Sequence, residues 1–154
     1  MNVFVSDEQS VPVDVAALRY LVDVVLEHER YPDQTEVTLM FVTDDVMAGY
    51  NDRFMSREGP TDVLAFPLEA HEPGVAPVVR PGDPPVALGD VIVAPDYVSR
   101  QASAHGVEFV DEMSLMVVHG LLHLMGWDHD DDQQAEHMEE RERSILAQVG
   151  VARS

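Results

Sequence analysis

Three histidines in the last third of the chain have the spacing of a metal site. His119 and His123 are four residues apart, which places both imidazoles on one face of a helix, about one turn apart. Gly126 favours the end of that helix, because glycine readily adopts a left-handed conformation, and the chain can then turn back and bring in His129. Three imidazoles with an open fourth position are typical of a catalytic zinc site. The pattern predicts one Zn²⁺ per chain, although nickel and cobalt also suit imidazole ligands.

Gly120, directly after the first histidine, limits the chemistry of such a site. In His-Glu-x-x-His peptidases this position holds the general base, whereas glycine can transfer no proton. A bound zinc ion would lower the pKa of its water to ~7 and make it a nucleophile for hydrolysis. The zinc hydroxide then acts alone, or a base comes from Glu112, Asp128 or Asp62. Glu112 is the first candidate because, seven residues before His119, it shares the helix face of the ligands.

Glycine inside a helix costs about 1 kcal/mol relative to alanine, so Gly120 predicts a close approach of another backbone or side chain beside the metal. The remaining histidines have no matching spacing and are expected on the surface or in loops: His28, His71, His105 and His137.

Composition excludes several kinds of protein. The 154 residues include no cysteine, which rules out disulfide scaffolds, thiolate metal sites and cysteine nucleophiles. Asp and Glu total 29 against 9 basic residues, all of them arginine, and the formal net charge is −20. Such a surface repels polyanions at long range and argues against non-specific nucleic-acid binding. Any binding of RNA would need a local positive patch.

The order of apolar periods and turn signals predicts an α+β fold with a mixed β-sheet of about four strands packed with helices. The helix predicted at 108–125 is apolar nearly all round, so we expect it at the centre of the protein. The expected strands are 3–5, 36–42, 63–66 and 87–93. The other expected helices are 13–28, 43–50, 95–106 and 130–149, and a proline-rich loop is expected at 67–86.

We expect one small domain over residues 1–154, with the metal site on its central buried helix. The first residues lack the basic and apolar regions of a signal peptide, and the most apolar stretch is too short to span a bilayer. The expected location is therefore the cytoplasm, with no membrane association.

Three motifs in order resemble those of the YbeY family of ribosomal-RNA maturation endoribonucleases. They are HGLLHLMGWDH at 119–129, PTDVLAFP at 60–67, where the family usually has Ser at Ala65, and LGDVIV at 88–93. Glu112 and the acidic last helix also fit the family pattern. The matches extend over most of the chain from Asn51 to Leu146.

The resemblance implies a zincin-like fold with a zinc ion on His119, His123 and His129. It also implies a cytoplasmic, single-strand-specific endoribonuclease that acts in 16S ribosomal-RNA 3′-end maturation and ribosome quality control. Many family members carry an arginine after the aromatic residue that precedes Pro-Thr-Asp, where this chain has Met55. Arg53 and Arg57 flank that position, and we expect them to stabilise the phosphorane charge.

Because the chain is so acidic, we expect weak RNA binding alone and recruitment to ribosomal RNA by a ribosomal protein or an assembly GTPase. RNA cleavage could use the 2′-hydroxyl of the RNA as the nucleophile in place of a metal-activated water. Two other functions stay open from the sequence: a zinc metallopeptidase, which Gly120 disfavours, and a non-catalytic ribosome-assembly factor with a structural zinc, which Met55 slightly favours.

Overall fold

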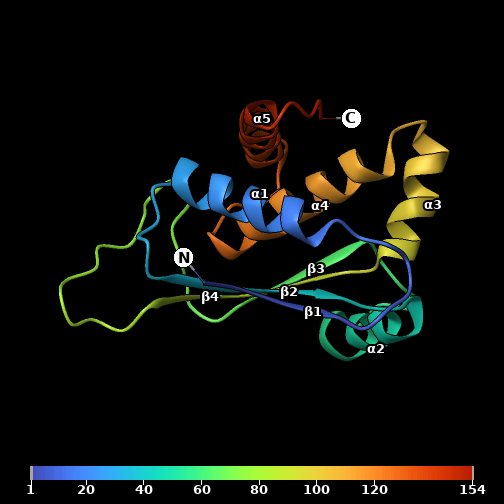
Figure 1. Cartoon of the computed structure of the whole chain (residues 1–154), viewed down its shortest axis with the longest axis horizontal. Coiled ribbons are helices and arrows are strands. Elements are labelled where there is room, and N and C mark those ends of the chain that lie inside the picture. Colours follow the sequence, from blue (N-terminus) through green and yellow to red (C-terminus); the bar gives the residue numbers. More distant parts are fainter. Residues whose placement is uncertain (1, 154) are drawn as a thin grey trace.

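The computed structural model describes residues 2–153, so Met1 and Ser154 of the expected 1–154 domain lie outside the described residues. One mixed sheet has the strand order β1-β2-β4-β3. The pairs β1–β2 and β2–β4 are parallel, whereas β3 is antiparallel to β4 and forms an edge of the sheet (Figure 1). The strands are β1 Asn2–Asp7, β2 Thr35–Phe41, β3 Val63–Pro67 and β4 Val86–Val93. The expected four-stranded mixed sheet is confirmed.

Four helices lie on one side of the sheet and one helix packs at the other face (Figure 1). The four on the first side are α1 Val15–His28, α3 Pro95–His105, α4 Phe109–Leu124 and α5 Asp132–Gln148, which packs on α1 and α4. The fifth is α2 Asp44–Met55, whose Met47 joins a small second core with Leu64 and Ile92. Polar side chains cap the helix starts as the sequence suggests, for example Thr43, whose hydroxyl accepts a hydrogen bond from the Val46 amide. Together these layers confirm the α+β class.

The end of α2 differs from the expectation. Its pattern predicts a stop near Tyr50, but the helix continues to Met55 and ends where Ser56 adopts a left-handed conformation with φ of 52°. The side chain of Asn51, which is buried, donates to the carbonyl of Gly59 and so ties the following turn to the helix. Sequence periodicity missed this extension because only tertiary contacts stabilise the last turn.

The helix α4 lies at the centre of the protein, as its apolar composition predicts. It packs against β3 and β4 of the sheet and against α1, α3 and α5 around it. Its buried apolar side chains join the main core: Met113, Leu115, Met116, Val117, Val118, Leu121, Leu122 and Leu124. Within residues 2–153, every helix is too short or too polar to cross a lipid bilayer.

Gly120 allows α4 to approach the sheet closely. A methyl group at this position would lie 2.6 Å from Cγ1 of Val91 on β4 and 3.3 Å from Cγ2 of Val63 on β3. Valine side chains in a core cannot move away freely, so only glycine fits without displacing a neighbour. The close approach predicted for Gly120 is confirmed, and it sets the depth at which the flanking histidines lie.

We predict that Gly120→Ala lowers the free energy of unfolding by about 1–3 kcal/mol, because the added methyl group overpacks the α4–β4 contact. Urea denaturation monitored by circular dichroism measures the change. Gly49→Ala on α2 is the matched control: its methyl group meets no atom within 4 Å, so helix propensity should stabilise the protein by up to about 1 kcal/mol. Equal stability of the two variants would contradict the packing argument.

Candidate metal centre

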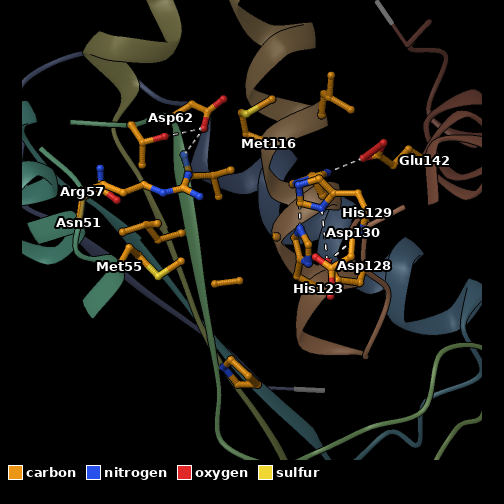
Figure 2. Close-up of a pocket in the computed structure, with 18 of the residues that line it drawn as sticks. Asn51, Met55, Arg57, Asp62, Met116, His123, Asp128, His129, Asp130 and Glu142 are labelled. Atoms are coloured by element: carbon orange, nitrogen blue, oxygen red, sulfur yellow. Dashed lines mark hydrogen bonds and ion pairs between the residues drawn. The ribbon is translucent and has the colours of Figure 1, made fainter. Parts of the chain in front are cut away.

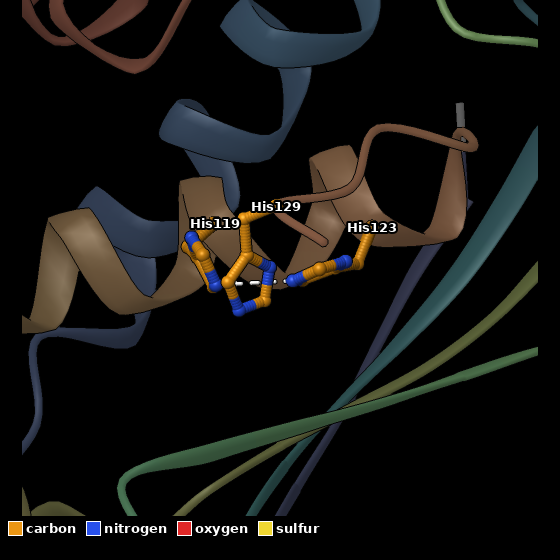
Figure 3. Close-up of side chains that lie close together, drawn as sticks. All are labelled: His119, His123 and His129. Carbon is orange, nitrogen blue, oxygen red and sulfur yellow. Dashed lines mark hydrogen bonds between the residues drawn. The ribbon is translucent and has the colours of Figure 1, made fainter. Parts of the chain in front are cut away.

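The three histidines converge at one point beside α4. One ligand nitrogen from each of His119, His123 and His129 lies within 4.8 Å of the others. His119 and His123 come from successive turns of α4, and His129 comes from the loop that follows the helix (Figure 3). Within residues 2–153 the group includes no fourth ligand residue, and the side chain of His129 is 55% exposed. The arrangement could hold a metal ion with one side open to solvent.

The spacing of the ring nitrogens fits a tetrahedral ion. The Nε2 atoms of His119 and His123 are 3.1 Å apart. Two Zn–N bonds of about 2.0–2.1 Å in a tetrahedron separate their nitrogens by about 3.4 Å, so a small adjustment would admit the ion. The donor set of neutral nitrogens suits zinc, nickel and cobalt alike.

Glu142 on α5 fixes the orientation of the first ligand. Nδ1 of His119 donates to Oε2 of Glu142 at 2.9 Å, which leaves Nε2 of the ring directed at the other histidines. Glu142 is 1% exposed, and Nε of Arg153 donates to its second oxygen at 3.1 Å. Burial alone would raise the pKa of Glu142, but the hydrogen bonds and charges of His119 and Arg153 outweigh it and hold the pKa below its usual value. An ionised carboxylate behind a ligand imidazole increases the basicity of the ring.

Burial also keeps the second ligand in its metal-binding form. Removal from water, together with the neighbouring His119 and His129, lowers the pKa of His123 to about 4. Because that value is well below 7, the ring is neutral at neutral pH, and a neutral imidazole has a lone pair available for a metal.

A second buried carboxylate fixes the loop that carries the third ligand. Gly126 has a φ of 96°, and a side chain there would collide with the carbonyl oxygen of His71. Nε1 of the next residue, Trp127, donates to Oε1 of the buried Glu29 at 2.9 Å. The guanidinium of Arg141 lies 4.6 Å from the indole centroid and forms an ion pair with Glu29 at 3.1 Å. The direction of His129 is therefore set by contacts with α1, α5 and the loop at 68–85.

The histidines form one wall of a cavity of about 670 Å³ (Figure 2). The opposite wall comes from the end of α2 and the turn after it, where Met55 and Arg57 line the cavity. The Arg57 side chain points into the space from that side (Figure 2). Its backbone amide donates to the carbonyl of Asn51, so the left-handed turn at Ser56 determines where the guanidinium begins. Asp62 and Asp128 are also among the lining residues.

Two predicted catalytic residues lie outside this cavity. Glu112 is buried and faces His105, with 3.4 Å between its Oε2 and Nδ1 of the ring. It lines an adjoining cavity of about 530 Å³, which shares Asp62 with the histidine cavity. Arg53 is not among the described lining residues, and its guanidinium lies 5.8 Å from the ring centroid of Phe54. The spacing that puts Glu112 on the ligand face of α4 also puts it two turns, or about 10 Å, from His119.

Of the four histidines expected on the surface or in loops, His71 is in a loop but its side chain is buried. That side chain is 5% exposed, and its Nδ1 is 3.1 Å from the hydroxyl of Tyr31. The proline-rich loop that holds it folds back against the end of α4, which local sequence does not reveal.

Sequence reasoning missed three residues that hold the site: Glu142, Arg153 and Glu29. One signal for Glu142 was present. Met138, Ile145 and Leu146 form the apolar stripe of α5, and Glu142 lies on the same face. A charged residue inside such a stripe needs a buried partner, and His119 is that partner. Glu29 and Arg153 gave no comparable signal.

The fold and the site define an α+β protein with three convergent histidines that could hold a metal ion. The family model "Endoribonuclease YbeY" matches residues 4–150. The curated endoribonuclease YbeY of Parafrankia sp. is 38% identical over 154 residues, 99% of this chain and 96% of that one. That of Thermobifida fusca is 36% identical over 147 residues, which is 96% of this chain and 93% of that one. This chain belongs to the endoribonuclease YbeY family.

A solved structure supports the fold assignment. The solution structure of TM1509 from Thermotoga maritima has a TM-score of 0.61 and 23% identity, and covers 96% of this chain and 91% of that one. The family predicted from the three motifs is confirmed, as is the class of enzyme, a nuclease that hydrolyses RNA. The roles of individual site residues stay predictions.

We predict that Glu142→Gln weakens metal binding about 10- to 100-fold, because the amide keeps the shape of the side chain but not the charge behind His119. Competition against a chromophoric chelator measures the affinity for Zn²⁺, and the visible spectrum with Co²⁺ reports the coordination number. Glu136→Gln is the matched control, since Glu136 lies exposed on the same helix. Equal affinities of the two variants would show that Glu142 serves only the fold.

Proposed function

We propose that this protein is a zinc-dependent, single-strand-specific endoribonuclease that acts in 16S ribosomal-RNA 3′-end maturation and ribosome quality control. The observation that carries the proposal is one cavity with three convergent imidazoles on one wall and an arginine on the other. A phosphodiester in that space would have a metal site on one side and a fixed positive charge on the other. The family contributes the substrate class, RNA.

His119, His123 and His129 would hold the ion. When bound, zinc supplies Lewis acidity, which activates water near neutral pH and polarises a phosphoryl oxygen. Glu142 keeps the first ligand in the correct tautomer by accepting its Nδ1 proton. The neutral state of His123 means that metal binding at neutral pH displaces no proton from this ring.

The other site residues act on the substrate and its protons. Arg57 is the residue placed to neutralise charge on the phosphorane, since its guanidinium enters the cavity opposite the ligands. We assign proton removal to Asp128, which adjoins His129 and lines the cavity. The amide of His129 donates to Asp128 at 2.7 Å and keeps the pKa of that carboxyl low, so the carboxylate is ionised at neutral pH. Glu112 and Arg53 do not line the cavity formed by the three clustered histidines, so they would act only indirectly.

The charge of the chain supports a need for recruitment. With a net charge of −20, the protein repels RNA beyond the immediate surroundings of the site. A ribosomal protein or an assembly GTPase would bring it to ribosomal RNA in the cytoplasm.

A metallopeptidase is disfavoured, because the position of the peptidase base is Gly120, which is packed against Val91. Met55 favours the non-catalytic alternative because it replaces an arginine. Arg57 lines the same wall of the cavity and supplies an arginine there, which weakens that alternative.

We predict that the zinc-loaded protein cleaves a single-stranded precursor of the small-subunit RNA 3′ end and that His119→Ala does not. Denaturing gels of end-labelled RNA measure cleavage, and metal content is determined on both proteins. Loss of zinc and of cleavage together supports the proposal. Equal cleavage by the two proteins would indicate a contaminating nuclease and remove the enzymatic interpretation.

A second comparison tests whether Arg57 or Arg53 contacts the reacting phosphate. Arg57→Gln is expected to lower kcat about 100-fold, because it removes a charge that faces the reacting phosphate. Arg53→Gln should leave kcat within about 2-fold, since its charge lies outside the cavity. Single-turnover cleavage with excess enzyme gives the rate of the chemical step. The reverse order of effects would assign the phosphate contact to Arg53.

A further inference from the structure

A cluster of three aromatic rings with one exposed member lies beside the metal cavity, and none of the three lines that cavity. The rings of Tyr50 and Phe54 on α2 stack with centroids 6.0 Å apart, and Phe54 meets Phe66 of β3 edge-on at 5.3 Å. We call these three residues the aromatic ridge. Phe54 keeps 55% of its surface exposed despite both contacts. One side of its ring is therefore available to a partner.

Two arginines flank the ridge and supply positive charge beside it. The guanidinium of Arg53 lies 5.8 Å from the Phe54 centroid, and Arg57 follows three residues later. Within residues 2–153, no carboxylate lies within ion-pair distance of either guanidinium, although Asp52 and Glu58 are neighbours in sequence. Four other arginines do have carboxylate partners: Arg100, Arg141, Arg143 and Arg153. In a chain of net charge −20, this is a local surface that a polyanion can approach.

The ridge is continuous with the metal cavity across the edge strand. On β3, Val63 and Ala65 pack with the main core on the α4 side, whereas Leu64 and Phe66 pack with the α2 side. Met55, next to Phe54, already lines the cavity. In Figure 2, Met55 and Arg57 lie across the strand from the histidines. A strand of nucleic acid with one phosphate at the histidines would therefore lead over the edge of β3 onto Phe54.

We propose that the aromatic ridge is a stacking platform for unpaired bases of the RNA strand next to the phosphate that is cleaved. The inference rests on the proposed function and adds to it a second contact for the substrate. Exposed aromatic rings accept any base, because every base has a π-face, and nearby arginines neutralise the adjoining phosphates. Inside a duplex, both faces of a base are covered by the neighbouring base pairs. The ridge therefore gives the enzyme selectivity for single strands with little sequence preference.

Continuity with the metal cavity favours RNA over a protein partner as the occupant. Aromatic rings and arginines occur in both kinds of interface, but this ridge adjoins the cavity in which the phosphodiester is proposed to bind, and Met55 and Arg57 line that cavity. Phe4 offers a matched comparison, because it is also an isolated exposed aromatic residue, 54% exposed against 55% for Phe54. It lies on β1, at the opposite edge of the sheet.

The first experiment measures stacking without cleavage. Phe54→Trp and Phe4→Trp are titrated with single-stranded RNA that carries a non-hydrolysable linkage, and the fluorescence change of the wild type, due to Trp127, is subtracted. We expect RNA to quench the new tryptophan at position 54 and not at position 4, and a duplex of the same sequence to quench neither. Absence of quenching at position 54 while RNA binds would overturn the proposal.

The second experiment measures the effect on cleavage. Phe54→Ala is expected to raise KM for single-stranded RNA about 10-fold or more and to leave kcat nearly unchanged, since it removes a base contact remote from the reacting atoms. Phe54→Tyr should restore the wild-type KM, and Phe4→Ala should not alter it. An abasic nucleotide near the scissile bond should raise KM for the wild type but not for Phe54→Ala, which identifies the stacked base.

The outcomes distinguish this inference from the proposed function. If the zinc-loaded wild type cleaves no RNA but quenching occurs at position 54, the proposed activity fails and the RNA-binding ridge stands. If the wild type cleaves RNA while Phe54→Ala has an unchanged KM and Phe54→Trp shows no quenching, the ridge does not bind RNA. That result would overturn the inference alone.

Discussion

The contact between α4 and the sheet at Gly120 sets the position of the two histidines that flank it. The helix lies so close to β4 that a methyl group would meet Val91 at 2.6 Å. Because His119 and His123 flank this contact on the same helix, their rings emerge beside β3 and face the end of α2. A larger residue at position 120 would lift the helix and widen the space between the histidines and Arg57. The glycine that disfavours peptidase chemistry is thus the residue that shapes the cavity.

Two buried carboxylates attach the three histidines to the rest of the protein. Glu142 orients His119 from α5, and Glu29 holds the loop before His129 through Trp127. A buried carboxylate is costly unless hydrogen bonds and opposite charges satisfy it. Here Arg153 and Arg141 provide those charges. The ligands are therefore held by α1, α5 and the loop at 68–85 as well as by α4, which keeps the ring nitrogens together.

Acidity and RNA binding are reconciled by location. The overall charge of −20 weakens encounter with any polyanion at long range. Close to the cavity, Arg57 and Arg53 supply positive charge, and the proposed zinc ion would add to it. The acidic surface elsewhere resists non-specific association with nucleic acid.

The sequence by itself determined the elements and the three histidines that converge. The apolar stretch of α4, the four-residue histidine spacing and the left-handed Gly126 depend on local periodicity and backbone preference, so they could be predicted without a structure. Only the tertiary structure decided which charged groups meet the metal centre. Glu142 is 23 residues from His119, and Glu29 is 98 residues from Trp127. The tertiary structure also separated Glu112 from the cavity. A shared face of α4 specifies the direction of a side chain but not its distance along the helix axis. Contacts between distant segments depend on how the layers pack, and no local pattern encodes that packing.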